Sequence, residues 1–315
     1  MQRRNFLKIT AISSLSLATG IGFLASKRYA SQRFAFQRFA LQRFDLQRFA
    51  LQRFEWHGVA FGADVHLVIK GDRERARASM QAVRKTIEAL ENHFSLYRSQ
   101  SEISRLNHAG LLPNPSHEMH EILAFSREIW QASDGLFNPS VGARWHELAR
   151  GQSPKAPIDF DNVQAKPDKV TLPANMRITL NGIAQGYASD HILFTLKSYG
   201  FEHVLVNMGE YRAGAGKWPL AAQGQRFVLN AHQAASTSNA NALILPQGHS
   251  HIIHPDGAKA IWQEVTVIAE TAARADGFST AFILMDAKQI QQVMRKHQDI
   301  IHVFIGDKEG KVRRL

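Results

Sequence analysis

Residues 59–94 read VAFGADVHLVIKGDRERARASMQAVRKTIEALENHF. Apolar side chains alternate with other residues from Val59 to Ile69, which predicts a half-buried strand. The apolar spacing then changes to three and four residues from Ala76 to Phe94, which predicts an amphipathic helix of about five turns. This stretch therefore predicts a domain that mixes strands with helices.

The rest of the body extends this mixed pattern. Further helices are expected over residues 116–133, 183–199, 274–285 and 287–297. Short strands are expected near residues 177–180, 203–207, 219–222, 226–230, 242–246, 264–269 and 300–305. Strands and helices do not alternate regularly, and several strands lie close enough to pair antiparallel. The pattern favours an α+β fold class, with a mixed, largely antiparallel sheet and flanking helices, over a doubly wound sheet.

Composition excludes several classes of protein. The 315 residues are 44% hydrophobic and 21% charged, which are ordinary globular values and exclude a wholly disordered chain. The absence of cysteine excludes disulfides, zinc–thiolate sites and thiol catalysis. Neither GxGxxG nor GxxxxGK[ST] occurs, so the two common nucleotide-binding loops are also absent.

The positive charge is concentrated at the start of the chain. The net charge is +11, but residues 1–57 hold ten Lys and Arg against Asp45 and Glu55, a balance of +8. The remaining residues carry only +3 and are close to neutral. We therefore expect no nucleic-acid partner.

The first thirty residues are expected to be a targeting segment. The chain opens MQRRNFLK, and an uncharged run follows from Ile9 to Ser26. Arg3 and Arg4 before this run resemble a twin-arginine export signal, and an ordinary membrane anchor is the alternative. The signal predicts the twin-arginine export machinery as a partner and the periplasm as the location, with an inner-membrane tether if the leader stays uncleaved.

A repeat of five residues follows, and we assign residues 31–56 to a low-complexity linker. The tripeptide Gln-Arg-Phe recurs from Gln32, Gln37, Gln42, Gln47 and Gln52. A period of five fits neither a helix nor a strand, so the phenylalanines cannot form one stable apolar face. The simpler interpretation of the repeat is a flexible spacer. The alternative is contact with an anionic membrane surface, which alternating Arg and Phe would suit.

Two motifs in the body carry candidate chemistry. TLNGIAQGYASD (179–190) passes from a strand into a helix through two glycines, and such helix starts suit a phosphate. In RADGFSTAF (274–282), Asp276, Ser279 and Thr280 share one helix face and offer the oxygen ligands that Mg²⁺ prefers. The alternative is that Asp276 caps the helix and the hydroxyls bond back to its carbonyls.

A third motif is rich in histidine. In GHSHIIHP (248–255), an extended chain would put His249 and His251 on one face and His254 on the other. A transition-metal site would need a further ligand on that face. A single histidine acting as a general base is the more economical interpretation.

Together these stretches resemble the ApbE family, the FAD:protein FMN transferases. The blocks that carry the resemblance, in the family's order, are YRSQSEISRLN (97–107), DGLFNPSVG (134–142), NGIAQGYA (181–188), VNMG (206–209), HIIHP (251–255) and ADGFST (275–280). The resemblance covers residues 57–315, the expected transferase domain. It implies an exported, Mg²⁺-dependent enzyme that takes FAD as a substrate, attaches FMN to a Thr or Ser of a flavoprotein, and releases AMP.

The resemblance also implies site residues. Asp276 and Thr280 match side-chain metal ligands, Gly182 matches a backbone carbonyl ligand, and Ser279 stands where some members add another. The matches to flavin-nucleotide contacts are Tyr97, Leu136, Phe137, Asn138, Thr179, Gln185 and Ile253, with Phe61 at a position usually held by Met. His251 matches the histidine beside the reacting phosphate.

Four positions depart from the family's usual charges. The family usually has Asp at the positions of Asn138, Thr179 and His254, and Lys or Glu at that of Gln185. With the twin-arginine leader, the LNGIAQGY variant is most similar to the NosX branch, whose target is a membrane-bound regulator of nitrous oxide reduction. The alternatives are a non-catalytic periplasmic flavin-binding accessory protein and a Mg²⁺-dependent FAD pyrophosphatase.

Overall fold

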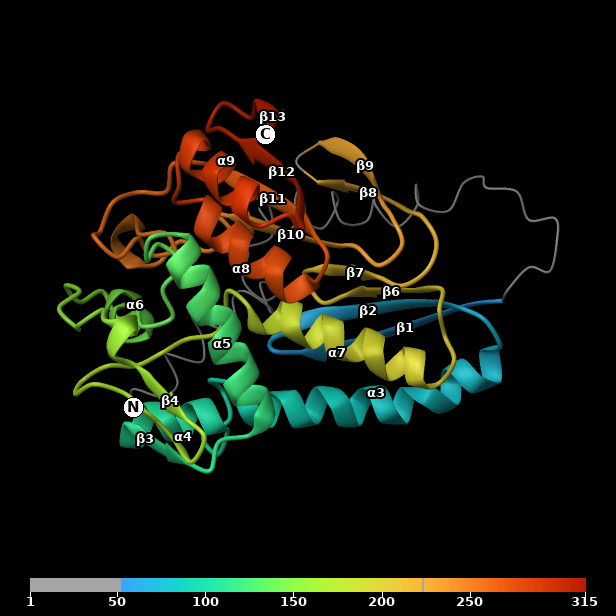
Figure 1. Cartoon of the computed structure of the whole chain (residues 1–315), viewed down its shortest axis with the longest axis horizontal. Coiled ribbons are helices and arrows are strands. Elements are labelled where there is room, and N and C mark those ends of the chain that lie inside the picture. The colour runs from blue at the N-terminus through green and yellow to red at the C-terminus, as the bar shows by residue number, and fades with distance from the viewer. Residues whose placement is uncertain (1–51, 223) are drawn as a thin grey trace, which may run out of the picture.

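The computed structural model describes residues 52–222 and 224–315, and its centre is an eight-stranded sheet (Figure 1). In spatial order the strands are β1 (Arg53–Ala60), β2 (Ala63–Lys70), β6 (Val204–Asn207), β7 (Tyr211–Ala213), β10 (Ala234–Asn239), β11 (Glu264–Ala269), β12 (Ile300–Gly306) and β13 (Val312–Arg314). Every neighbouring pair in this sheet is antiparallel. The α+β fold class is therefore confirmed.

Helices cover one face of this sheet. The helices of the described residues are α3 (Arg73–Phe94), α4 (Glu102–Ala109), α5 (His117–Ala132), α6 (Gly142–Ala149), α7 (Ala184–Ser198), α8 (Ala272–Phe282) and α9 (Ala287–Lys296). Of these, α3, α7 and α8 pack directly on the large sheet. Figure 1 shows α3 and α7 running side by side along the lower edge of the molecule, with α8 and α9 above them. The main core lies between these helices and the sheet, and it includes Leu67, Val206 and Phe278. Burying a helix stripe against a sheet face in this way stabilises the layers.

Two small sheets complete the structure. The hairpin of β8 (Trp218–Ala222) and β9 (Gln225–Leu229) packs a second apolar cluster against the other face of the large sheet. The strands β3 (Leu111–Pro113), β5 (Lys169–Thr171) and β4 (Gln164–Lys166) form a separate three-stranded sheet beside α4. Two 3₁₀ turns, Phe160–Asn162 and Pro246–Gly248, lie in connecting segments.

The predicted strand over residues 59–69 is wrong in one respect, because a turn divides it. Phe61 and Gly62 both have positive φ, 51° and 74°, and they join β1 to β2 as a hairpin. Alternation continues through Val65, Leu67 and Ile69 in β2, which are buried. Val59, in contrast, is 68% exposed. The apolar pattern ran across the turn because Phe61 occupies a turn position that usually favours Gly, Asn or Asp.

The predicted helices are confirmed with small shifts at their ends. The caps explain the boundaries: Asp72 accepts a hydrogen bond from the Arg75 N–H at the start of α3, and Ser116 accepts one from Met119 in α5. Thr271 caps α8, which consequently starts two residues before the predicted 274. Capping side chains satisfy N–H groups that the first helical turn leaves free.

Other expectations are corrected. Residues 177–180 and 242–246 form only isolated bridges, Val141 with Arg177 and Ile244 with Ser250, in place of the predicted strands. The strand β10 and the helices α4 and α6 were not predicted. The sequence of β10, AASTSN, is short and polar, and Thr237 is its one β-branched residue, so it carries only a weak strand signal.

The beginning of the chain lies outside the described residues. The expected leader (1–30) and most of the repeat segment (31–56) belong to this part. The strand β1 begins at Arg53, inside the last Gln-Arg-Phe copy and before the boundary expected at residue 57.

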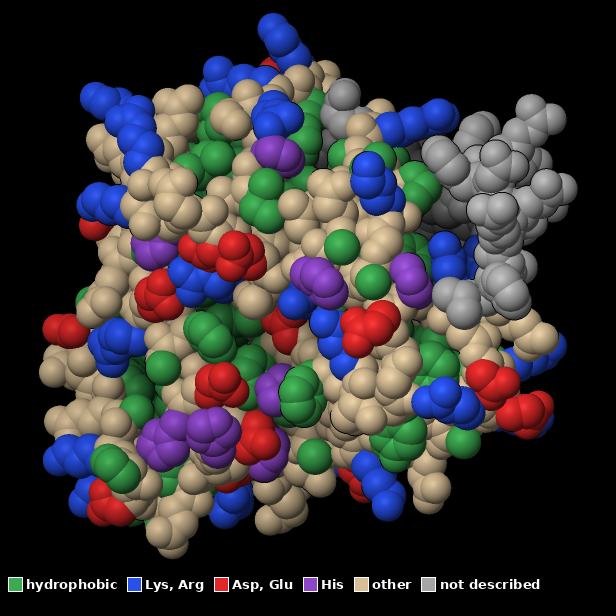
Figure 2. Space-filling model, turned by 45° about the vertical axis from the view of Figure 1, so that its right-hand side comes forward, with side chains coloured by type: hydrophobic (Ala, Val, Ile, Leu, Met, Phe, Trp, Pro, Cys, Tyr) green, Lys and Arg blue, Asp and Glu red, His purple; other side chains and the backbone are tan. Residues whose placement is uncertain are grey.

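Within residues 52–222 and 224–315, none of the helices combines the length and apolar character needed to cross a bilayer. Figure 2 shows basic and acidic side chains interspersed on the face that it displays.

Candidate functional site

The candidate site is built where the start of α7 crosses α8. Gly186 packs so closely on α8 that a Cβ there would lie 2.2 Å from the Ala272 carbonyl oxygen. The Gly186 N–H donates a hydrogen bond of 3.1 Å to Asp276 Oδ2. One turn away, a Cβ on Gly182 would lie 2.9 Å from Thr280 Oγ1. Segment 182–186 therefore runs along the face of α8 that carries Asp276 and Thr280.

Asp276 is an unusual carboxylate because it is only 5% exposed. Burial raises its pKa to about 7, and the hydrogen bond from Gly186 offsets part of that rise. This is the one hydrogen bond to the carboxylate that the described residues supply. A cation bound here would compensate the cost of burying the charge. The expectation that Asp276 caps the helix is wrong, because Thr271 does so.

The hydroxyls of α8 continue into β10. Ser279 lies 2.8 Å from Ser238 Oγ and 3.2 Å from Ser236 Oγ, and it donates to the Asp276 carbonyl at 3.0 Å. The back-bonding expected for a buried helix hydroxyl is therefore present at Ser279. Thr280 Oγ1 lies 3.4 Å from Ser238 Oγ. Of the two, the Thr280 hydroxyl is the one that faces Gly182.

The donor set fits a hard cation. Asp276, Thr280 and Gly182 offer a carboxylate, a hydroxyl and a backbone carbonyl along one line of contact between α7 and α8. Mg²⁺ prefers such oxygen ligands and completes its shell with water and phosphate oxygens. Among the described residues, one group of three His and acidic side chains has its ligand atoms within 4.8 Å of one another, Glu55, His57 and His66, and it lies on β1 and β2. His249, His251 and His254 do not form such a group in the described part of the chain, so the alternative of a transition-metal site in this motif is not supported.

His251 lies in the loop that leaves β10. Its Nδ1 is 3.1 Å from the Leu243 carbonyl oxygen, and its backbone N–H donates to the same oxygen at 3.1 Å. Because a carbonyl only accepts, Nδ1 carries the proton and Nε2 keeps its lone pair. Burial holds the pKa of His251 below its ordinary value. The side chain is therefore a neutral imidazole with a basic Nε2 near pH 7.

The loop containing His251 is fixed to the end of β10 that carries Ser238. The Ser250 hydroxyl donates to the Ala240 carbonyl at 2.8 Å, directly after β10. Ile253 packs on a small apolar cluster with Leu148 of α6. His254 Nδ1 accepts from the Asp256 N–H at 3.1 Å, which closes the following turn.

Asn138 and Thr179 are brought together by backbone pairing. The Thr179 N–H donates to the Pro139 carbonyl at 2.8 Å, and Val141 forms a bridge with Arg177. Asn138 Oδ1 accepts from the Ser140 hydroxyl at 2.6 Å. The Thr179 hydroxyl accepts from the Asn181 N–H at 3.3 Å. Both side chains therefore shape turns beside the start of α7.

The remaining expected residues lie on neighbouring segments. Tyr97 is close to the β1–β2 turn, where a Cβ on Gly62 would be 3.8 Å from the tyrosine ring. The Phe61 N–H at this turn donates to Glu91 Oε1 at 2.9 Å. A Cβ on Gly209, in the VNMG loop, would lie 3.8 Å from the Gln185 amide. Phe137 is buried in the main core, whereas Leu136 is only partly buried.

Sequence reasoning missed two sets of supporting residues. Ser236 and Ser238 join the α8 hydroxyls, and their spacing of two residues, which puts both on one face of a strand, was the available signal. Asp190 accepts from the Ala272 and Ala273 N–H groups at 3.0 and 2.9 Å, so it caps α8 from α7. Burial raises the pKa of Asp190, although Arg212 lies 2.6 Å away. No local motif marks such a contact between distant segments.

Comparison with protein families gives one match. The ApbE family model matches residues 61–305. An FAD:protein FMN transferase of Salmonella typhimurium is 25% identical over 288 residues, covering 78% of this chain and 81% of that protein. Another, from Haemophilus influenzae, is 23% identical over 287 residues, with 78% and 82% covered.

Solved structures share the fold. The flavinyl transferase ApbE of Pseudomonas stutzeri, in its apo form, superposes with a TM-score of 0.73 at 20% identity, covering 86% of this chain and 97% of that one. An ApbE protein of Thermotoga maritima gives a TM-score of 0.71 at 22% identity, with 84% and 97% covered.

Proposed function

The chain belongs to the ApbE family, and from this premise we propose that it is a Mg²⁺-dependent FAD:protein FMN transferase, the activity for which its relatives are named. Its substrates are FAD and a Thr or Ser hydroxyl of an acceptor flavoprotein. The hydroxyl oxygen forms a bond to the FMN phosphorus as the bond between that phosphorus and AMP breaks. The hydroxyl proton is removed, and no electrons are exchanged.

The observation that carries this proposal is the close packing of residues 182–186 on α8. It supports assigning the Asp276 carboxylate, the Thr280 hydroxyl and the Gly182 carbonyl as the Mg²⁺ ligands. Ser279 forms hydrogen bonds with Ser238 and with the Asp276 carbonyl of its own helix, and through these bonds it supports the residues of the ligand set. Bound Mg²⁺ would neutralise charge on the pyrophosphate and on the departing AMP.

His251 is the proposed general base. The Leu243 carbonyl fixes its Nδ1–H, and burial keeps the ring neutral, so Nε2 is able to accept the acceptor's proton. Flavin-nucleotide contacts are assigned to Phe61, Tyr97, Leu136, Phe137, Asn138, Thr179, Gln185 and Ile253. The pairing of Asn138 with the Thr179 segment supports treating these two residues as one part of that surface.

We assign the enzyme to the periplasm, delivered by the twin-arginine leader at residues 1–30 and tethered to the inner membrane if the leader stays uncleaved. Arg3 and Arg4 before the uncharged run support this location. The acceptor is then an exported or membrane flavoprotein. The regulator of nitrous oxide reduction is the candidate that the NosX-like LNGIAQGY motif favours.

The test uses the full chain in detergent with FAD, Mg²⁺ and an FMN-accepting protein domain, followed by intact-mass spectrometry of the acceptor. We expect the acceptor to gain the mass of FMN. EDTA and Asp276→Asn are each expected to lower the transfer at least 10²-fold, because the buried carboxylate is the charged ligand. The control is Asp168→Asn, an exposed aspartate outside the site, which is expected to retain full activity.

Other outcomes would identify the alternatives. Release of FMN and AMP without any acceptor would indicate an FAD pyrophosphatase, with water in place of the hydroxyl. Stable FAD binding with neither product nor modified acceptor, across several acceptor domains, would indicate a non-catalytic flavin-binding protein. Either outcome would contradict the transferase proposal.

A further inference from the structure

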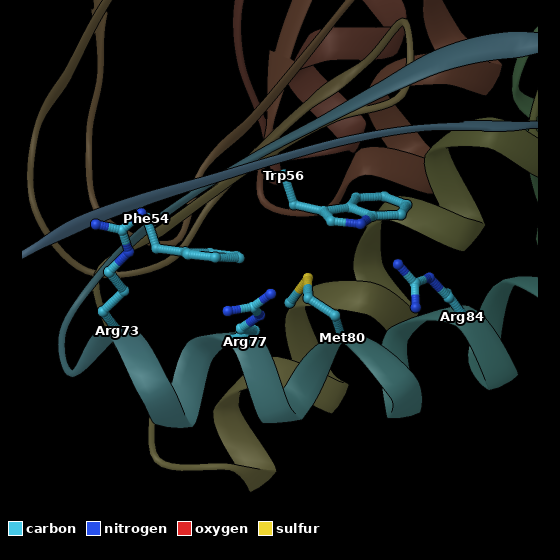
Figure 3. A pocket seen from close by; sticks show the side chains of 6 residues that line it. All are labelled: Phe54, Trp56, Arg73, Arg77, Met80 and Arg84. Atoms are coloured by element: carbon cyan, nitrogen blue, oxygen red, sulfur yellow. The ribbon is translucent and has the colours of Figure 1, made fainter.

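A cavity of about 540 Å³ lies between β1 and α3 (Figure 3). None of the candidate site residues lines it. Its walls are Phe54 and Trp56 of β1 and Arg73, Arg77, Met80 and Arg84 of α3. In Figure 3 the two aromatic rings approach the helix from the strand above it, and the arginine side chains rise from the helix below. The cavity therefore combines an aromatic wall with a row of cations.

The local structure explains why these residues meet. Positions 73, 77, 80 and 84 are spaced by four, three and four residues, so they form one stripe along α3. Phe54 and Trp56 are two residues apart and point to the same face of β1. The indole of Trp56 lies along the strand over Gly58, where a Cβ would be 2.2 Å from a ring carbon. A glycine at this position is what allows the ring to lie flat beside the cavity.

The charge of the cavity is not balanced by its surroundings. Within the described part of the chain, no carboxylate forms an ion pair with Arg73, Arg77 or Arg84. Arg84 instead lies 5.9 Å from the centre of the Trp56 ring, in cation–π range. The adjacent Asp72 is used to cap α3. Three exposed guanidinium groups therefore face an apolar wall, with no carboxylate paired to them among the described residues.

We propose that this cavity and its arginine stripe bind the phosphate headgroups of anionic phospholipids and hold the folded domain against the membrane. The arginine stripe extends about 16 Å along α3, which is long for a single phosphate and suits neighbouring headgroups on a surface. Basic residues attract an anionic leaflet, and Trp prefers the interface between lipid and water. The strand β1 continues directly from residues 1–51, which include the expected leader, and the inference rests on that proposed tether. The arginine-rich repeat carries the same sign of charge as the cavity and therefore does not complement it.

A site-resolved experiment uses the full chain reconstituted into phosphatidylcholine nanodiscs, with or without phosphatidylglycerol. Phenylglyoxal modifies exposed arginines, and peptide mass spectrometry then reads the rate at each position. We expect phosphatidylglycerol to slow the modification of Arg77 and Arg84 several-fold. Arg105, an exposed residue of α4, should be unchanged and serves as the internal control. Equal rates with and without phosphatidylglycerol would overturn the proposal.

Soluble anions provide the second arm. Inorganic phosphate and FMN are each added to the phosphatidylcholine nanodiscs, because both could occupy an arginine-lined cavity. Protection by phosphatidylglycerol alone supports a lipid site. Protection by either soluble anion in the absence of phosphatidylglycerol overturns the lipid assignment in favour of a soluble-anion site.

Variants that each remove one positive charge distinguish a specific lipid site from a general effect of net charge. Arg77→Gln and Arg84→Gln should each lower the affinity for short-chain phosphatidylglycerol about fivefold, measured by calorimetry. Lys85→Gln removes the same charge from a position outside the cavity lining and should leave the affinity unchanged. Equal losses in all three variants would mean that net charge, and not the cavity, attracts the lipid. FMN transfer to a soluble acceptor should be normal in each variant, so failure of this inference is distinguishable from failure of the proposed function.

Discussion

His251 illustrates how the environment of one residue sets its chemistry. Its pKa is held below 6.5 by burial, so the deprotonated base is the major form at pH 7. At saturating Mg²⁺, which would keep the Asp276 carboxylate ionised, we expect the transfer rate to be constant between pH 8 and 7 and to fall only as the pH drops through the lowered pKa of His251, where the ring gains a proton. His251→Gln should lower the rate about 10²–10⁴-fold and remove this acid limb. His249→Gln, an exposed neighbour, should keep the wild-type profile in the same assay.

The side chain of Thr179 offers a test of its proposed role as a flavin-nucleotide contact. Its hydroxyl accepts from the Asn181 N–H, and an aspartate could make the same bond with one carboxylate oxygen. The second oxygen would restore the charged acceptor that the family usually has. We expect Thr179→Asp to tighten FAD binding about tenfold, measured by fluorescence titration. An unchanged or weaker affinity would show that another group already fills this role.

The crossing of α7 and α8 makes a prediction at the scale of elements. In Gly186→Ala the new methyl group would overlap a backbone carbonyl, so the helices must separate, at a cost of about 2–3 kcal/mol. In Gly182→Ala the methyl group meets the Thr280 side chain, which can rotate away. We therefore expect thermal denaturation to show the larger loss for Gly186→Ala. Gly182→Ala should instead mainly reduce Mg²⁺-dependent activity, and the reverse ranking would contradict the crossing described here.

The sequence predicted elements best where one pattern dominates. The stripe of α3 and the caps of α5 and α9 are local signals, and each of these helices was predicted close to its observed range. The β1–β2 turn was missed because Phe61 continues the apolar alternation between Val59 and Ala63, so the sequence reads as one strand across the turn. The strand β10 was missed because its pairing with β7 and β11, and not its composition, makes it a strand.

The same distinction applies to the candidate site. The Asp276–Thr280 pair could be found from helical spacing, since both residues lie on α8. The contact of Gly182 with Thr280 could not, because the spacing of one segment says nothing about the element packed on it. Asp190, which caps α8 from α7, was missed for the same reason. The six ordered blocks supplied such long-range information only through resemblance to a family.

At the scale of the whole molecule, a charge cluster joins α5, α8 and the turn before β12. Arg274 forms a bidentate pair with Glu128, at 2.6 and 2.8 Å, and also binds Asp299. The Arg274 guanidinium holds the pKa of Glu128 below its ordinary value. A lowered pKa of this kind contributes stability above the ordinary pKa of 4.5, and the contribution is lost as the pH falls through the lowered value.

Glu128→Gln should therefore destabilise the protein by about 0.5–1 kcal/mol at pH 7, because this carboxylate is partly exposed. At acid pH, below the lowered pKa of Glu128, the variant and the wild type should converge, since the wild-type carboxylate is then protonated. Urea denaturation at both pH values measures the difference. Glu309→Gln, an exposed change outside the cluster, should have no effect at either pH. An equal loss at both pH values would assign the effect to packing and not to charge.

The order of strands in the large sheet has a consequence for biosynthesis. The strand β2 pairs with β6 through partners such as Leu67 and Val206, which belong to distant parts of the chain. About two thirds of the protein must leave the ribosome before this pair can close, and slow folding is typical of such long-range pairing. The main core also contains Val303 and Ile305 of β12, so it is completed only after β12 has left the ribosome. If the proposed twin-arginine leader delivers the chain, a translocase for folded cargo would act only after this late closure of the core.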